Sequence, residues 1–186
     1  MALTESNPFP QGSKAPDFKL PDTVSGKVLS LAELKSNKAT VIMFICNHCP
    51  YVKHVNSGLV ELAEKYIAKG VSFIGINSND ASRYPEDSPE QMTVSAKRNN
   101  YPFPYLYDER QEVARSYGAA CTPEFYVFDK ELMLIYHGQM DDSRPSNSIP
   151  VTGKDLALAL DLTLAGKPYT GLQKPGIGCG IKWRND

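Results

Sequence analysis

A run of β-branched and apolar residues from Val41 to Ile45 ends directly in Cys46-Asn-His-Cys49-Pro50. Such a run is typical of a buried strand, and a helical pattern begins immediately after the second cysteine. A strand that delivers two thiols to a helix start places them beside unpaired backbone N–H groups and the positive end of the helix dipole. Because that environment stabilises a thiolate, the feature predicts both an α/β fold and thiol chemistry.

A long amphipathic helix and a second buried strand follow the two cysteines. Apolar residues recur at steps of three and four, and Gly70 ends the pattern. Residues 71–76 then form a buried strand, so strand, helix and strand make a βαβ unit with parallel strands. Residues 125–128 and 132–136 flank a charged turn, which predicts an antiparallel hairpin, and a last helix begins near Thr152.

Additional segments surround this centre. We expect residues 1–14 to be a mobile lead-in and residues 15–29 to hold two short, paired strands. Ser30-Leu-Ala-Glu33 is a capping box that opens a short helix. An inserted segment at about 77–107 contains a polar loop, a helix and a short strand, and the tail, residues 167–186, is rich in glycine and proline.

Composition excludes several functional classes. The chain has 186 residues, enough for a single domain, residues 1–186, with a sizeable core. Its net charge of −1 favours neither nucleic acid nor an anionic membrane as a partner. The N-terminus lacks a signal-peptide pattern, and no run approaches the ~20 apolar residues that span a bilayer, so we expect a cytoplasmic protein. There, a Cys-x-x-Cys is catalytic or metal-binding rather than structural.

The two cysteines of the motif can act in either order. In the first, Cys46 is the exposed nucleophile, Cys49 is the buried resolving thiol, and an imidazolium at His48 stabilises the Cys46 thiolate. In the second, Pro50 is the first helical residue and Cys49 is the N-cap, which places Cys49 closest to the helix dipole. The residues leave both orders open, and we favour the first.

A second informative stretch, Ala120-Cys121-Thr122-Pro123, precedes the predicted hairpin. It resembles the cis-proline loop of thioredoxins, which packs against the disulfide and pairs with substrate. Together with Cys46-Asn-His-Cys49-Pro-Tyr-Val52 and a C-terminal Gly178-Cys179, it resembles thioredoxin-fold proteins of the alkyl hydroperoxide reductase/thiol-specific antioxidant group, in their peroxiredoxin-like subgroup. The resemblance covers about residues 12–183.

The resemblance carries expectations about fold and chemistry. It implies an α/β, thioredoxin-like fold in which helices flank a central mixed sheet, with an N-terminal β extension and a peroxiredoxin-like insertion. It implies a redox pair, Cys46 and Cys49, supported by His48, Thr122 and Pro123, without an organic cofactor or a metal. The implied partners are a protein or small-molecule disulfide and an external thiol reductant.

Some positions depart from the peroxiredoxin pattern of Pro-x-x-x-Thr-x-x-Cys. Counting back from Cys49, Ile42 takes the Pro position and Cys46 the Thr position. Pro123 takes the position that an arginine holds in the peroxiredoxin pattern, just ahead of a later strand. Those absent groups bind and polarise peroxide, so the departures argue against efficient peroxidase chemistry.

Other positions depart from thioredoxin itself. Ile45 replaces the tryptophan before the first cysteine, and Thr40 replaces the buried acid of the preceding strand. The proton acceptor for Cys49 is therefore either His48 or a loop carboxylate.

Alternative functions stay open on the sequence alone. Cys49 could act as a peroxidase whose sulfenic acid is captured by Cys46 or Cys179. All four cysteines could bind zinc, or the pair could sense redox state without turnover. Cys121 is either a core thiol or a third redox thiol. We expect Cys179 to be an exposed tail thiol, with a resolving role as the alternative.

Overall fold

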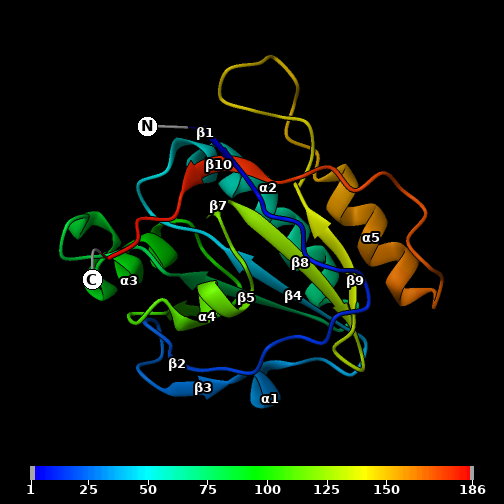
Figure 1. Ribbon diagram of the computed structural model, residues 1–186, viewed down its shortest axis with the longest axis horizontal. Coiled ribbons are helices and arrows are strands. Elements are labelled where there is room, and N and C mark those ends of the chain that lie inside the picture. The colour runs from blue at the N-terminus through cyan, green and yellow to red at the C-terminus, as the bar shows by residue number, and fades with distance from the viewer. Residues whose placement is uncertain (1–2, 185–186) are drawn as a thin grey trace.

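The computed structural model describes residues 3–184 and centres on a five-stranded mixed sheet of order β6-β5-β4-β8-β9 (Figure 1). The middle strand, β4 (Ala39–Phe44), pairs in parallel with β5 (Val71–Asn77) and antiparallel with β8 (Glu124–Asp129). β5 pairs in parallel with β6 (Tyr105–Tyr107), and β9 (Leu134–Gly138) forms a hairpin with β8. The predicted βαβ unit and hairpin are confirmed, with the hairpin strands displaced by one or two residues.

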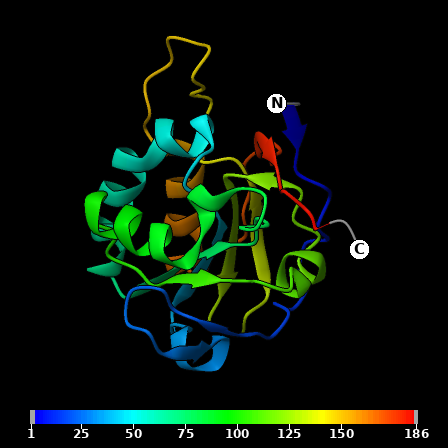
Figure 2. The same cartoon turned by 90° about the vertical axis from the view of Figure 1, so that its left-hand side faces the viewer.

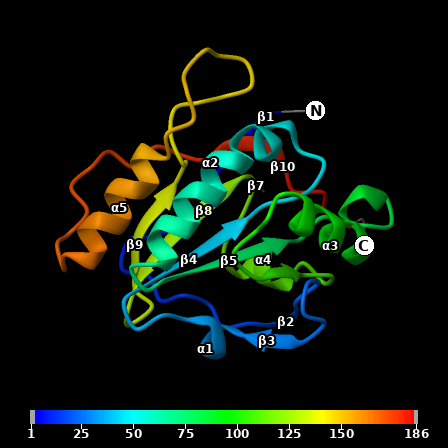
Figure 3. The same ribbon diagram turned by 180° about the vertical axis from the view of Figure 1, so that it is seen from behind.

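Helices cover both faces of this sheet because β4 is apolar on both sides. Val41 and Met43 belong to one buried core, whereas Ile42 and Phe44 belong to a second. Figure 3 shows the longest helix, α2, running along the face of the first core. The helices that contribute to the first core are α2 (Pro50–Ile67), α3 (Pro89–Arg98) and α5 (Lys154–Leu164), and those that contribute to the second are α1 (Leu31–Leu34) and α4 (Glu112–Ser116).

The N-terminal strands and the inserted segment form the elements expected of them. β2 (Lys19–Pro21) pairs antiparallel with β3 (Val28–Ser30). The capping box of α1 is complete, because the Ser30 N–H donates to Glu33 Oε2 at 2.8 Å and the Glu33 N–H donates to Ser30 Oγ at 3.4 Å. The insertion holds η1 (Pro85–Asp87) before α3 and β6. Within residues 3–184, no helix has the length and apolar character needed to cross a bilayer.

A separate three-stranded sheet joins the two ends of the described chain. β10 (Ile177–Gly180) lies between β1 (Leu3–Glu5) and β7 (Cys121–Thr122), and both pairings are antiparallel. Figure 2 shows β1 and β10 side by side, in blue and red. The prediction of a mobile lead-in is wrong for residues 3–5, because β10 provides them with a strand partner. The tail is likewise ordered at 177–180, where it pairs on both edges.

Candidate functional site

The two cysteines of the motif lie where the central strand meets its helix. Cys46 follows β4 in the connecting loop, and Cys49 is the N-cap of α2, with Pro50 as the first helical residue. Proline suits this position because its missing N–H would have no helical partner there. Cys49 therefore faces the first turn of α2, where backbone N–H groups and the helix dipole favour negative charge.

The second predicted stretch lies directly against both sulfur atoms. The Thr122–Pro123 peptide bond is cis. Cys46 Sγ is 3.2 Å from Thr122 Oγ1, and Cys49 Sγ is 3.2 Å from the Thr122 carbonyl oxygen. The second contact is a hydrogen bond only when Cys49 carries its proton. One threonine thus touches both thiols through two different groups.

The thiols are closed off from solvent in this structure. Cys46 is 2% exposed and Cys49 is 0% exposed, so the expectation of an exposed Cys46 is wrong. All four cysteines are reduced, and Cys179 is 4% exposed, which also overturns the prediction of an exposed tail thiol. Since β10 packs against both α2 and β7, it forms part of the cover over the pair.

A hydrogen-bonded histidine–aspartate pair lies beside Cys46. His48 Nδ1 is 2.6 Å from Asp87 Oδ2, and Asp87 is fully buried. The Asn79 side chain donates to the same oxygen at 2.8 Å, and the Asn47 N–H donates to Asp87 Oδ1 at 2.7 Å. The Tyr84 ring stacks on the His48 ring, with 5.3 Å between centroids. These contacts fix the imidazole close to Cys46.

The charges of this pair reinforce each other. The hydrogen bond that His48 donates to Asp87 raises the pKa of His48. Burial by itself raises the pKa of Asp87, but the hydrogen bonds from His48, Asn79 and Asn47 outweigh it, so the pKa of Asp87 is lowered overall. Asp87 is thus a loop carboxylate of the kind that the sequence left as an alternative to His48. It could have been suspected from its place just before Ser88, which caps α3 and holds the loop end in position.

The two thiols share a single negative charge unequally. The pKa of Cys49 is lowered to about 5, chiefly by a hydrogen bond from the Cys46 thiol, with further hydrogen bonds from the Cys179 thiol and the Val52 N–H. Burial, together with the neighbouring Cys49 and Asp87, raises the pKa of Cys46. Of the two thiols, Cys49 is therefore the one that loses its proton more easily. This distribution favours the second of the two orders considered for the motif.

The same neighbourhood contains the atoms best placed to bind a metal. Cys46 Sγ, a His48 ring nitrogen and an Asp87 oxygen lie within 4.8 Å of one another. Within residues 3–184, the possible metal ligands that lie close together are these three residues, and not the four cysteines considered from the sequence. His48 and Asp87 already form a hydrogen bond with each other, and they would have to separate to bind an ion.

A buried glutamate that sequence reasoning missed fixes the other side of the proline loop. Glu124 is fully buried and accepts hydrogen bonds from the Ala120 N–H at 2.9 Å and the Tyr126 hydroxyl at 2.7 Å, with His137 Nε2 at 2.6 Å. Cys121 Sγ lies 3.8 Å from the same carboxylate. Burial and the Glu124 charge raise the pKa of Cys121, so this thiol stays protonated.

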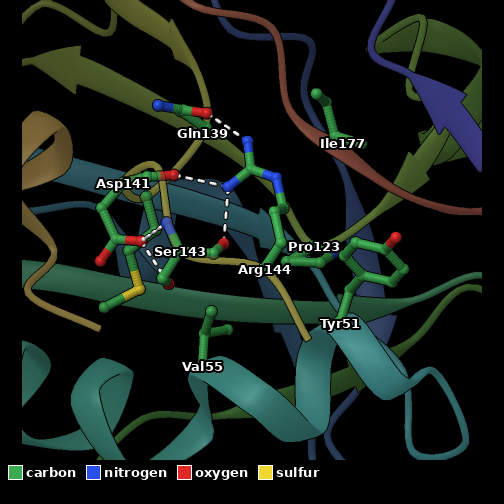
Figure 4. Close-up of a pocket in the computed structure, with 9 residues that line it drawn as sticks. Tyr51, Val55, Pro123, Gln139, Asp141, Ser143, Arg144 and Ile177 are labelled. Atoms are coloured by element: carbon green, nitrogen blue, oxygen red, sulfur yellow. Dashed lines mark hydrogen bonds between the residues drawn. The ribbon is translucent and has the colours of Figure 1, made fainter. Parts of the chain in front are cut away.

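A small pocket lies beside Pro123, between α2 and the loop that follows β9. Tyr51, Val55 and Ile177 contribute its apolar walls (Figure 4). Arg144 crosses it and donates to the carbonyl oxygens of Asp141 and Ser143, each at 2.7 Å. The pocket is therefore a recess beside the proline loop with a fixed cation at its rim.

A thioredoxin-like fold that presents two thiols at a helix start defines a class of thiol-based redox proteins, and comparison with known proteins agrees. Residues 11–137 match the model of the AhpC/TSA family, and the chain belongs to that family. Chloroplastic peroxiredoxin Q of Gentiana triflora is 28% identical over 158 residues, covering 80% of this chain and 67% of that protein. Thiol-disulfide oxidoreductase ResA of Bacillus thuringiensis is 24% identical over 129 residues, covering 69% of each.

Solved structures share the same architecture. The crystal structure of an uncharacterized conserved protein from Geobacillus kaustophilus is 59% identical with a TM-score of 0.98, covering 100% of this chain and 98% of that one. The thioredoxin domain of a thiol-disulfide oxidoreductase from Bacteroides vulgatus is 16% identical with a TM-score of 0.62, covering 81% of this chain and 97% of that one. The expectation of a thioredoxin-like α/β fold is confirmed, and relatives of both enzyme kinds support a redox role.

Proposed function

We propose that this protein is a thiol–disulfide oxidoreductase of the peroxiredoxin-like subgroup, acting through Cys46 and Cys49. The observation that carries the proposal is the position of the Cys49 sulfur. It lies at the N-terminus of α2, accepts a hydrogen bond from Cys46, and has a pKa lowered to about 5. A thiolate is the nucleophile in disulfide exchange, and this one is present at neutral pH.

The exchange proceeds in two balanced steps. The Cys49 thiolate attacks one sulfur of a substrate disulfide, so a mixed disulfide forms and the other substrate sulfur leaves as a thiolate. Cys46 then gives its proton to the substrate thiolate released in the first step and attacks the Cys49 sulfur, which releases the second substrate thiolate and leaves the Cys46–Cys49 disulfide. The substrate gains two electrons, the pair loses two, and an external thiol reductant restores the pair.

The His48–Asp87 pair supports the second step. Cys46 must carry negative charge while it attacks, and burial opposes that charge. The raised pKa of His48 keeps a proton on the imidazole close to Cys46. His48 Nε2 is buried and has no hydrogen-bond partner within residues 3–184, so it is free to interact with a developing charge. His48 is accordingly a positioning and electrostatic residue rather than the nucleophile.

A thiol peroxidase is the second candidate, favoured by the same low pKa at a helix N-cap. The Cys49 thiolate would attack a peroxide, become a sulfenic acid and release an alcohol or water. Cys46 would then condense with the sulfenic acid, forming the same disulfide and water. The positions held by Ile42, Cys46 and Pro123 lack the side chains that polarise a peroxide in the family pattern. We therefore rank disulfide exchange first.

The test compares insulin-disulfide reduction with peroxide consumption in wild type, Cys46→Ser and Cys49→Ser. Disulfide exchange predicts that Cys49→Ser loses insulin reduction because it lacks the attacking sulfur, and that Cys46→Ser loses most of it because it lacks the thiol that releases the bound substrate. Cys121→Ser is the matched control, because its sulfur contacts Glu124 rather than the pair. Peroxide consumption that survives Cys46→Ser but not Cys49→Ser, without insulin reduction by wild type, would overturn the proposal in favour of the peroxidase.

A further inference from the structure

The third thiol of the site comes from the far end of the chain. Cys179 stands opposite Thr122 in the β10–β7 ladder, and Thr122 is the residue that contacts both cysteines of the pair. Directly opposed residues in an antiparallel pair have their Cβ atoms about 4.5–5.5 Å apart. Cys179 belongs to the same buried core as Cys46 and Cys49, and its thiol is among the groups that lower the pKa of Cys49.

Two glycines that precede Cys179 let the chain lie unusually close to the proline loop. A Cβ at Gly178 would lie 1.9 Å from the Thr122 carbonyl oxygen, and one at Gly176 would lie 3.3 Å from the Pro123 carbonyl oxygen. Only a residue without a side chain fits at 178. The glycines therefore let β10 approach β7 closely enough for Cys179 to reach the redox pair.

Further contacts hold the strand in this position. The Ser6 N–H donates to the Gly176 carbonyl at 2.8 Å, and the Ile181 N–H donates to the Ala120 carbonyl at 3.0 Å. The Lys182 N–H donates to Asn79 Oδ1 at 2.8 Å, and Asn79 also bonds Asp87. Cys179 is consequently a fixed member of the site rather than a thiol that arrives by chance.

We propose that Cys179 is a third redox thiol that exchanges with the pair and forms a Cys49–Cys179 disulfide. The inference rests on the proposed function of Cys46 and Cys49. In the exchange, Cys179 sulfur attacks Cys49 sulfur of the Cys46–Cys49 disulfide and Cys46 leaves as a thiolate. The proton that Cys179 loses passes to Cys46. One S–S bond breaks and one forms, so no outside oxidant or reductant takes part.

Oxidation of the pair changes the surroundings of the Cys179 thiol in the direction that this attack needs. In the reduced site, burial raises the pKa of Cys179 to about 12, helped by its hydrogen bond to Cys49 and by the charge there. Once Cys49 is bound in a disulfide, that charge is gone, while the nearby Lys182 still favours a Cys179 thiolate. Oxidation of the pair therefore removes two of the three contributions that raise the pKa of Cys179, while burial, the largest of them, remains.

Cys121 is the natural comparison because it is equally buried and belongs to the same small sheet. Its sulfur is directed at Glu124 and at the Gly176 carbonyl, which lie 3.8 Å and 3.7 Å away. It stands opposite Gly180 in the ladder, whereas Cys179 stands opposite Thr122. Proximity alone would allow either cysteine to react, but the direction of the sulfur atoms selects Cys179.

The experiment oxidises the reduced full-length protein with stepwise additions of diamide and maps the disulfides by non-reducing peptide mass spectrometry. Diamide accepts two electrons and two protons from each pair of thiols. Wild type should lose two thiols first and yield both 46–49 and 49–179 peptides. Cys46→Ser should convert fully to 49–179, with no 49–121 peptide. Cys49→Ser should lose the 49–179 cross-link and yield no equivalent rapid product.

The outcomes separate this inference from the proposed function. A 46–49 cross-link in wild type, with no 49–179 peptide in either wild type or Cys46→Ser, would overturn the role of Cys179 alone. Absence of any 46–49 cross-link in wild type would overturn the proposed function itself. Far-ultraviolet circular dichroism checks that each variant is folded. If Cys46→Ser fails to fold, the wild-type peptide map alone decides the question.

Discussion

Cys46→Ala should raise the pKa of the Cys49 thiol, because it removes the group that contributes most to lowering it. A hydrogen bond to a charged group contributes about 1.5–3 kcal/mol, and one pKa unit corresponds to about 1.36 kcal/mol. The pKa of Cys49 should therefore rise by about 1–2 units from its starting value of about 5. The Cys179 thiol and the Val52 N–H remain, so the pKa stays below the ordinary value of 9.0.

The assay follows the ultraviolet absorbance of the thiolate while reduced protein is titrated upward from acid pH. Wild type should gain one thiolate with a midpoint near pH 5, and Cys46→Ala should gain it at a higher pH. Cys121→Ala is the matched control, since it removes a buried thiol that bonds Glu124. An unchanged or lowered midpoint in Cys46→Ala would refute the hydrogen bond from Cys46 as the main cause of the low pKa of Cys49, and the absence of any thiolate at low pH in Cys46→Ala would refute the assignment of the charge to Cys49.

Three further substitutions test the surroundings of the site. Asp87→Asn should lower the pKa of His48 towards 6.5. The raised pKa of His48 stabilises the fold fully below pH 6.5, and the lowered pKa of Asp87 stabilises it fully above pH 3.8. Asp87→Asn should therefore lower the free energy of urea unfolding by about 1–3 kcal/mol, with the largest loss between those two pH values. The loss should shrink at alkaline pH, where His48 is neutral in the wild type as well. Gly178→Ala forces a Cβ against the Thr122 carbonyl and should cost about 1–3 kcal/mol while speeding alkylation of the pair. Glu124→Gln presents an amide to buried donors and should lower the unfolding free energy by about 1–3 kcal/mol, measured by urea unfolding.

The parts of the fold that sequence predicts are those whose signal is local. The apolar run of β4, the capping box at Ser30 and the proline after Cys49 each specify their structure from neighbouring residues. The placement of Thr122 and Pro123 against the pair was predicted by resemblance to a known loop. The local patterns and the loop resemblance are strong signals because few other structures satisfy them.

The parts that sequence reasoning misses depend on contacts between distant residues. β1 and β10 are short, and the glycines of β10 indicate a loop until a partner strand is known. Cys179 was therefore predicted to be exposed, although it is buried opposite Thr122. Sequence reasoning misses Asp87 for a similar reason, because its partner His48 is 39 residues away.

The ladder of β1, β10 and β7 has a practical consequence for the design of fusion proteins. Strands near both ends of the described chain belong to this ladder, and Figure 2 shows β1 and β10 side by side in it. A purification tag, a fluorescent reporter or a surface linker fused to either end would therefore be attached next to this ladder. The turn between β8 and β9, around Lys130, lies at the opposite end of the strands and offers an anchoring point that leaves the ladder untouched.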